Sequence, residues 1–255
     1  MTLLPDAFLT QPLAHRALHD VAAGRPENSR SAILAAVEHG YGIEIDVQLS
    51  SDGRAMVFHD YALDRLTGQS GPLRQMTASE LGQIALAGGD GEGIPSLSEV
   101  LELVSGRVPL LVEIKDQDGA MGPHVGPLET AVADDLRGYG GPVAVMSFNP
   151  HSVEAFASAS PQTPRGLTTC SYDPSDWPLS EATCAHLREI PDAERLGISF
   201  ISHEAGDLAR PRVAELKGQG LAILCWTIRS PAEEAEARKV AANITFEGYL
   251  PEKPT

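Results

Sequence analysis

The feature that most constrains the fold is an alternation of short apolar runs and helical patterns along the 255 residues. Each apolar run ends in polar or charged residues, and a turn rich in Gly, Pro or Asp precedes the next helical pattern. Eight such repeats predict a parallel sheet closed as an α/β, TIM-type (β/α)8 barrel. The expected strands are Pro12–His15, Tyr41–Leu49, Leu110–Lys115, Val143–Phe148, Arg165–Thr169, Gly197–Ser202, Ala222–Thr227 and Asn243–Phe246.

Helices are expected between these strands, at Ser29–His39, Ser96–Ser105, Gly126–Arg137, Pro150–Ala157, Asp207–Gly218 and Pro231–Ala241. In a TIM barrel the reacting groups lie at the carboxyl ends of the strands. The polar residues that close each apolar run are therefore the candidates for a functional site. No interdomain linker is visible, so residues 1–255 are expected to form a single barrel domain.

One segment breaks the alternation and predicts an insertion. The run Arg54–His59 is typical of a strand, but it follows the second expected strand after only Asp52-Gly53. A two-residue Asp-Gly link favours an antiparallel hairpin and is too short for a parallel crossover. The chain then makes an excursion, from Asp60 to about Ile94, that belongs to no barrel repeat. We therefore expect a small inserted subdomain after the second strand, at about residues 50–95.

The expected register of this hairpin brings an imidazole to two carboxylates. If Ser51 pairs with Arg54, then Asp46 lies opposite His59. Glu44 shares the face of Asp46, because side chains alternate along a strand. The hairpin thus predicts a cluster of titratable groups at the end of the second strand.

The net charge limits the partners of the chain. It carries 19 basic and 35 acidic residues, a formal net charge of −16. A field of this sign repels nucleic acids and anionic lipid surfaces, so no nucleic-acid partner is expected. A small phosphate-bearing substrate would need a local positive centre, either a bound cation or a few placed basic groups. The three cysteines show no CxxC spacing and predict neither a disulfide framework nor a zinc motif.

The N-terminal segment favours a cytoplasmic location. Met1 to Gln11 lacks the basic region and the long apolar region of a signal peptide. No apolar stretch approaches the ~20 residues that a membrane span requires. We therefore expect a cytoplasmic protein without stable membrane insertion, and the oligomeric state is left open.

Three carboxylates are predicted to converge at one rim of the barrel. Glu44 and Asp46 share a face of the second expected strand, and Glu113 lies near the end of the third. Unpaired carboxylates held together repel one another and are costly to desolvate, which a divalent cation would relieve. Oxygen ligands suit Mg²⁺, Ca²⁺ or Mn²⁺. Zinc is a poorer fit to this pattern, which contains no cysteine and no helical histidine pair.

Two histidines and two basic residues lie at neighbouring strand ends. His15 closes the first expected strand and His59 closes the hairpin. Imidazole titrates near neutral pH, so the pair predicts a general acid and a general base. Arg16 and Lys115 are expected to contact non-bridging phosphate oxygens. Together with the carboxylates, these residues indicate metal-assisted phosphoryl chemistry.

A longer ordered set of motifs runs along the chain: His15-Arg16, Arg25-Pro26-Glu27-Asn28-Ser29, Glu44-Ile45-Asp46-Val47, Ser51-Asp52-Gly53, His59-Asp60, Leu63-Asp64-Arg65-Leu66-Thr67-Gly68, Ile94-Pro95-Ser96-Leu97, Glu113-Ile114-Lys115, Ser147-Phe148 and Trp226-Thr227. As an ordered set they resemble the signature of the glycerophosphodiester phosphodiesterase family, in the phosphatidylinositol phosphodiesterase-like TIM barrel superfamily. The likeness covers nearly the whole chain and is densest over the first 115 residues.

The resemblance implies a TIM barrel with a small inserted subdomain that hydrolyses glycerophosphodiesters to glycerol 3-phosphate and an alcohol. It also implies a divalent cation on the three carboxylates, an acid–base pair of the two histidines and phosphate contacts from the two basic residues. Two residues would support the loop after the first strand, Glu27 and Asn28. Two more would line the pocket, Phe148 and Trp226.

The chain departs from the family pattern in places. Ala17 stands where the family usually has Gly, and its methyl group is expected to narrow the site or to require ordinary φ and ψ angles. The loop Leu18–Gly24 is long, and the usual Thr-Asp-x-Pro is replaced by the segment Thr245–Pro251. Two further residues after strands, His124 and Glu204, are weaker candidates for the site.

Two other interpretations stay open. One is a different phosphodiesterase of the same superfamily, either lysophospholipase D-like, sphingomyelinase D-like or a metal-free relative of phosphatidylinositol-specific phospholipase C. The metal-free enzyme would not need the three carboxylates together. The other is an inactive barrel that binds a glycerophosphate. Such a protein would be expected to lose a histidine or a carboxylate, and all five are present.

Overall fold

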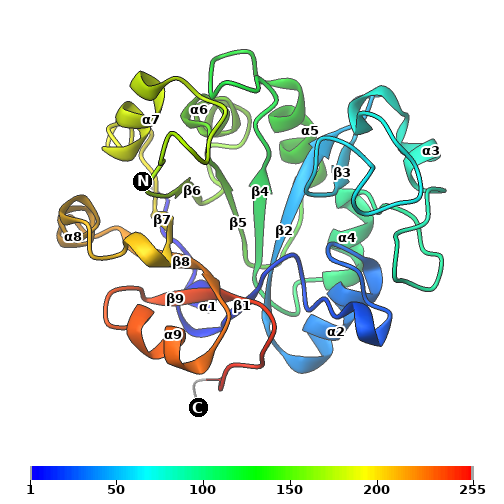
Figure 1. The fold of residues 1–255 in the computed structure, drawn as a ribbon, viewed down its shortest axis with the longest axis horizontal. Helices are drawn as coiled ribbons and strands as arrows, with labels where there is room; N and C mark the ends of the chain where they lie inside the picture. Colours follow the sequence, from blue (N-terminus) through cyan, green and yellow to red (C-terminus); the bar gives the residue numbers. More distant parts are fainter. Residues whose placement is uncertain (1, 254–255) are drawn as a thin grey trace.

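The computed structural model describes residues 2–253 and confirms the TIM-type barrel (Figure 1). The strands run in the order β1-β9-β8-β7-β6-β5-β4-β2-β3, and a β1–β2 pairing closes the ring. All neighbours in the ring are parallel, and β3 pairs antiparallel with β2 outside it. The strands are β1 (Leu13–Ala14), β2 (Gly42–Leu49), β3 (Ala55–Val57), β4 (Leu110–Ile114), β5 (Val143–Ser147), β6 (Arg165–Thr169), β7 (Phe200–Glu204), β8 (Ala222–Ile228) and β9 (Asn243–Phe246).

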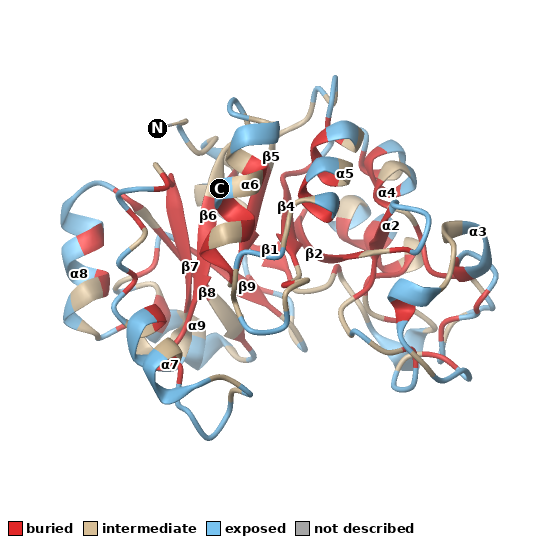
Figure 2. Cartoon of the chain, turned by 90° about the horizontal axis from the view of Figure 1, so that it is seen from above, coloured by how far each residue is buried: buried red, intermediate tan, exposed pale blue. Residues whose placement is uncertain are grey.

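The helices surround this ring, with their exposed faces outward and the buried strands inside (Figure 2). Among residues 2–253, none of them combines the length and the apolar character needed to cross a membrane. The helices are α1 (Ala7–Thr10), α2 (Arg30–His39), α3 (Ala78–Leu81), α4 (Leu97–Val104), α5 (Pro127–Asp135), α6 (Pro150–Ala159), α7 (Glu181–Arg188), α8 (Pro211–Gly218) and α9 (Pro231–Ala237), with 3-10 turns η1 (Val21–Ala23), η2 (Leu73–Gln75) and η3 (Ala205–Asp207).

Side-chain alternation along β2 separates the core from the pocket. Ile43, Ile45 and Val47 join the large apolar cluster that packs the ring against the helices. Glu44 and Asp46 point to the other face, inside the ring, where they line a pocket. A period of two along the strand therefore places apolar side chains under the helices and carboxylates in the barrel mouth.

A second apolar cluster fills the other end of the barrel. Phe8 of α1 joins inward-facing strand residues there, which are Leu13, Leu111, Ala144, Met146, Phe200 and Leu224. The Asn243 amide donates to the carbonyl oxygens of Phe8 at 2.8 Å and Gln11 at 2.6 Å, which ties α1 across the amino ends of the strands. The barrel is thus filled by side chains at the amino ends of the strands and open at the carboxyl ends, as in other TIM barrels.

The hairpin exists, but its predicted register is wrong by one residue. Val47 pairs with Val57, and Leu49 pairs with Ala55. The loop has three residues, 51–53, and Gly53 adopts φ +79°, the left-handed conformation that a three-residue hairpin loop requires. Phe58, rather than His59, therefore lies opposite Asp46, and its backbone N–H donates to the Asp46 carbonyl at 3.0 Å.

The insertion that follows β3 has an apolar core of its own. Its buried members are Met56, Phe58, Leu63, Leu73, Leu81, Ile84, Leu86 and Ile94. The segment carries η2 and α3 and lies beside the barrel at the β2–β3 edge (Figures 1 and 2). This core explains why the excursion keeps a defined shape although it belongs to no barrel repeat.

Most expected elements are present with small shifts at their ends, and three differences lie between residues 181 and 211. Strand β7, the sixth of the expected barrel strands, begins at Phe200 instead of Gly197, because Gly197 adopts φ +56° in the turn before the strand. The helix expected from Asp207 begins at Pro211, whose ring suits the first helical position. Helix α7 was not expected from the sequence, although Ser180 caps it by accepting from Thr183 N.

Candidate active site

The predicted site residues line one pocket of about 160 Å³ at the carboxyl ends of the strands. All nine of them are present there: His15, Arg16, Glu44, Asp46, His59, Glu113, Lys115, Phe148 and Trp226. Met146, Thr168, Thr227, Arg229 and Thr245 complete the wall. The structure thus gathers residues that are spread over more than 200 positions of the sequence, since the parallel strands end at the same rim.

Three buried carboxylates form the floor of this pocket. Glu44, Asp46 and Glu113 are each at most 6% exposed, and each offers an oxygen within 4.8 Å of the other two. β2 and β4 bring them together because Asp46 and Glu113 pair directly across the two strands. Burial, followed by the charges of its two neighbours, raises the pKa of Glu44 well above its usual range. Their crowding is therefore costly without a cation.

Two basic side chains reach these carboxylates. The Lys115 ammonium lies 2.8 Å from Asp46 Oδ1 and 2.6 Å from Glu113 Oε1. Arg16 Nε lies 3.7 Å from Asp46 Oδ2, and the Arg16 backbone N–H donates to Glu44 Oε2 at 2.9 Å. Although burial opposes it, the charges of Asp46 and Glu113 raise the pKa of Lys115. Lys115 therefore remains protonated and offsets part of the negative charge.

The loop after β1 supports the carboxylates from behind. The buried Asn28 amide donates to Asp46 Oδ2 at 3.0 Å. Glu27 accepts from the Arg16 guanidinium at 2.8 Å and so directs it toward the pocket. Ala17 adopts φ +65°, so the expectation that its methyl group would require ordinary φ and ψ angles is wrong. Its backbone N–H donates to the Glu44 carbonyl at 2.9 Å, which holds the turn against β2 in this left-handed conformation.

His59 is held by the residue that follows it. Its Nδ1 donates to Asp60 Oδ1 at 2.6 Å, so its Nε2 is the nitrogen left for a substrate. Burial and the Lys115 charge lower the pKa of His59 to about 4, which makes the ring neutral at pH 7. Arg65 holds Asp60 with two hydrogen bonds, at 2.7 and 2.8 Å, and reaches Glu27 with two more.

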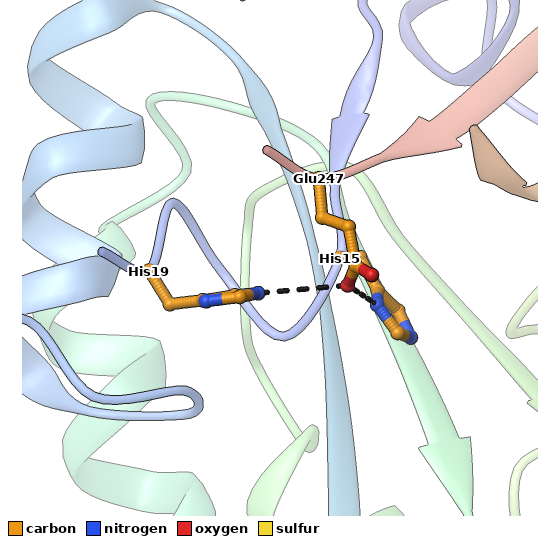
Figure 3. Close-up of side chains that lie close together, drawn as sticks. All are labelled: His15, His19 and Glu247. Atoms are coloured by element: carbon orange, nitrogen blue, oxygen red, sulfur yellow. Dashed lines mark hydrogen bonds and ion pairs between the residues drawn. The ribbon is translucent and has the colours of Figure 1, made fainter. Parts of the chain in front are cut away.

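His15 is held in the same way by a distant carboxylate. Its Nδ1 donates to Glu247 Oε2 at 2.6 Å, and Arg229 Nε donates to the other oxygen, Oε1, at 2.8 Å. Burial lowers the pKa of His15, whereas the His15 and His19 imidazoles hold the pKa of Glu247 well below its usual range. Figure 3 shows both imidazoles directed at the one Glu247 carboxylate.

Glu247 is the functional candidate that the sequence analysis missed. It lies 232 residues from His15, in the segment where the chain departs from the family pattern. The departure from the family pattern in this segment was the one sequence feature that could have pointed to Glu247. The pairing of β1 with β9 brings the two together, since His15 N donates to the carbonyl oxygen of Phe246 at 2.9 Å.

An aromatic wall closes one side of the pocket. The rings of Phe148 and Trp226 meet edge to face with centroids 5.6 Å apart, and Trp177 packs behind Phe148 at 5.1 Å. Trp226 Nε1 donates to the Ser202 carbonyl at 3.0 Å, which fixes the indole. The wall offers an apolar surface beside charged groups, a combination that suits a small organic phosphate.

The two weaker candidates lie elsewhere. The His124 side chain is 88% exposed and pairs with Asp118 at 2.7 Å. Glu204 accepts from the Ser171 backbone N–H at 2.9 Å. Neither is among the described residues that line the pocket.

Comparisons with known proteins agree with this geometry. The model of the Glycerophosphoryl diester phosphodiesterase family matches residues 15–245. YhdW of Bacillus subtilis (strain 168) is 28% identical over 245 residues, which cover 93% of each protein. The Glycerophosphodiester phosphodiesterase of Caldanaerobacter subterraneus subsp. tengcongensis is 34% identical over 151 residues, 56% of this chain and 60% of that protein.

A solved structure shares the fold. It is a phosphodiesterase of Oleispira antarctica in complex with the product sn-glycerol-3-phosphate, with a TM-score of 0.77 and 24% identity over 94% of each chain. Because the family match spans most of the sequence, this protein is an enzyme of the glycerophosphoryl diester phosphodiesterase family.

Proposed function

We propose that the enzyme hydrolyses glycerophosphodiesters to glycerol 3-phosphate and an alcohol, with a divalent cation on Glu44, Asp46 and Glu113 and with His15 and His59 as the acid–base pair. The observation that carries this proposal is the position of two carboxylate-held imidazoles beside three buried carboxylates in one pocket. The family supports a phosphodiester substrate. The product bound to the Oleispira antarctica relative supports glycerol 3-phosphate as the retained half.

The donor set fits a hard cation. All three ligands are carboxylates, which suit Mg²⁺, Ca²⁺ or Mn²⁺, and they are buried close enough to share one ion. When bound, the cation would polarise a phosphoryl oxygen and offset the negative charge of the transition state. Asn28 orients Asp46 and the Arg16 backbone N–H orients Glu44, so the ligands are held in place by the fold itself.

The two imidazoles have the proton positions that acid–base catalysis needs. A carboxylate fixes Nδ1–H of each ring, so each Nε2 can accept or deliver a proton. One ring accepts a proton from the attacking oxygen, and the other, once protonated, donates to the leaving alcohol. The attacking oxygen is either that of water, which gives glycerol 3-phosphate directly, or that of a glycerol hydroxyl group, whose cyclic phosphate product water then opens. Arg16 and Lys115 lie beside the carboxylates and would hold the non-bridging phosphate oxygens. Phe148 and Trp226 would contact the carbon skeleton of the substrate.

The test is glycerol 3-phosphate release from glycerophosphodiesters with choline, ethanolamine, glycerol and inositol headgroups. We expect release with Mg²⁺, Ca²⁺ or Mn²⁺ and none after chelation. His15→Ala and His59→Ala should each lower turnover by ~10²-fold or more. His124→Ala is the matched control, because His124 also pairs with an aspartate but lies outside the pocket.

Two results would contradict the proposal. Release that persists in chelator would remove the role of the cation. Activity only on lysophospholipids would instead indicate the lysophospholipase D-like reaction, with the same barrel used on a lipid substrate.

A further inference from the structure

A second group of metal-binding side chains lies next to the catalytic pocket. His15, His19 and Glu247 each offer a ligand atom, and these atoms all lie within 4.8 Å of one another (Figure 3). The three come from the end of β1, the loop after it and the segment after β9. We propose that they form a transition-metal site, with Zn²⁺ as the best-fitting ion, that takes His15 out of catalysis when it is filled.

The chemistry of the donors selects the ion. Two imidazole nitrogens and one carboxylate oxygen suit zinc, whereas Mg²⁺ and Ca²⁺ prefer ligand sets of oxygen alone. Tetrahedral zinc with bonds of about 2.0–2.1 Å separates its ligand atoms by about 3.3 Å. Glu247 Oε2 lies 2.6 Å from His15 Nδ1 and 3.6 Å from His19 Nε2. The third pair of ligand atoms, His15 Nδ1 and His19 Nε2, lies within 4.8 Å, so replacement of the shared proton by zinc requires side-chain movements on the order of 1 Å.

His19 shows the strongest sign of a ligand role. Its Nε2 is buried and lies 3.6 Å from Glu247 Oε2, too far for a hydrogen bond, and it has no other hydrogen-bond partner among the described residues. The turn before it contains two left-handed residues, Arg16 and Ala17, and His19 N donates to the Ala17 carbonyl at 2.9 Å. This turn directs the ring back toward the end of β1. A free nitrogen aimed at a carboxylate fits a metal ligand better than a solvent-facing histidine.

The Glu247 carboxylate has one oxygen available for the ion. Arg229 occupies only Oε1 of Glu247, so Oε2 remains for the two imidazoles. An outer-sphere partner of this kind orients a metal ligand. The Asp20 carboxylate accepts from Ala22 N and Ala23 N, so a water rather than Asp20 would complete the coordination.

The group can be reached without passing the three-carboxylate site. His19 lines a separate hollow of about 470 Å³, together with Leu18, Asp20, Arg25, His39, Gly248, Tyr249 and Leu250. The three ligand side chains are 16%, 24% and 21% exposed, in the order His15, His19 and Glu247. A hydrated ion can therefore approach from solvent on this side of the β1 loop.

Occupancy would stop His15 from moving protons. Zinc on Nδ1 needs the lone pair of that nitrogen, so the neutral ring must carry its single proton on Nε2 instead of sharing it with Glu247. Such a ring cannot accept a proton at Nε2, and a neutral imidazole is a far weaker acid than an imidazolium. This consequence rests on the proposed role of His15, whereas the binding of zinc does not.

The binding experiment is equilibrium dialysis of the full chain against Zn²⁺. We expect the wild type to bind one equivalent more than His19→Asn, with a tenfold or greater loss of affinity at the altered site. His124→Asn is the control, since it removes an exposed histidine from a His–Asp pair for which the described residues offer no third ligand. Equal zinc binding by the wild type and His19→Asn would overturn the site. His19→Gln, with thermal unfolding of both variants, guards against a folding defect.

The activity experiment is zinc inhibition of glycerophosphodiester hydrolysis in excess Mg²⁺. Without zinc, His19→Asn should turn over within about twofold of the wild type, and it should need at least tenfold more zinc for half-inhibition. Equal inhibition of both proteins would place the inhibitory zinc on the three carboxylates and overturn the regulatory claim. Zinc bound through His19 without any inhibition would keep the site but refute the catalytic role of His15.

Discussion

The two histidines of the pocket are held by similar contacts that come from different parts of the chain. At each one, Nδ1 lies 2.6 Å from a carboxylate oxygen, and an arginine binds the other oxygen of that carboxylate. Asp60, the partner of His59, is its neighbour in sequence, whereas Glu247 lies 232 residues from His15. The same geometry can therefore be set by a local turn or by closure of the barrel.

The arginines differ more than the histidines do. Arg65 belongs to the insertion and makes hydrogen bonds to both Asp60 and Glu27, and Glu27 in turn holds Arg16. Arg229 makes a side-chain pair with Glu247 alone and is 61% exposed. The His59 side is therefore part of a network that reaches the phosphate-binding residues, whereas the Glu247 carboxylate on the His15 side contacts only the two imidazoles and one exposed arginine among the described side chains.

Removal of the charge from Glu247 or Asp60 should cause the largest loss of turnover. In Glu247→Gln and Asp60→Asn, the amide NH₂ group can face Nδ1 and favour the tautomer with its proton on Nε2. We expect turnover to fall about 10²-fold in each, with little change in substrate KM. Steady-state kinetics of the two variants, with Asp118→Asn beside His124 as the control, measures this directly. Full activity in Glu247→Gln would show that only the His59 side needs its carboxylate.

Removal of the two arginines should lower kcat/KM by different amounts on the His59 and His15 sides of the pocket. Arg65→Ala should lower kcat/KM about tenfold, because Asp60 and Glu27 both lose a bidentate partner. Arg229→Ala should lower it less than about threefold, as is usual for an exposed ion pair. The ratio of the two kcat/KM values is the measurement, and equal losses would remove the distinction between the two sides.

The Asp60 carboxylate should make stability depend on acid pH. Although burial opposes it, hydrogen bonds from Arg65 and His59 lower the pKa of Asp60 to about 2, below the unfolded value of about 3.9. A lowered pKa stabilises the fold above pH ~4, and this contribution is lost as the pH falls toward 2. Because solvent screens this partly exposed carboxylate, we expect it to contribute about 1 kcal/mol to the free energy of unfolding above pH ~4. Urea unfolding of the wild type and Asp60→Asn at pH 6 and pH 3 should show the difference shrinking at the lower pH, and a constant difference would refute it.

A substitution at Ala17, in the turn that follows His15, should have the smallest effect, and it should act on stability. Ala17 is held at φ +65°, a conformation that costs an L-residue about 1 kcal/mol more than glycine. Ala17→Gly should therefore raise the free energy of unfolding by less than about 1 kcal/mol, since part of the relief is offset by unfolded-state entropy. Denaturant unfolding measures the change, and turnover should stay within about twofold. A destabilised variant would show that the Ala17 methyl group, which is buried, packs more strongly than the strain it causes.

Some features of the site could be predicted because they depend on local spacing. Glu44 and Asp46 share a face through the period of two along β2, and the order of the motifs placed them with Glu113. The hairpin register could not be predicted, because a change from a two-residue to a three-residue loop shifts every cross-strand pair by one. His59 reaches the pocket only because the chain leaves the strand after Val57.

The sequence by itself determined the barrel, the insertion and nine of the residues that line the pocket. Alternating apolar and polar positions dictate which face of each strand is buried, and this rule acts over a few residues. Only the tertiary structure decided that Glu247 holds His15 and that His19 turns toward the same carboxylate. Those contacts join the two ends of the chain through the pairing of β1 with β9, and no local pattern carries information about a distance across a closed ring.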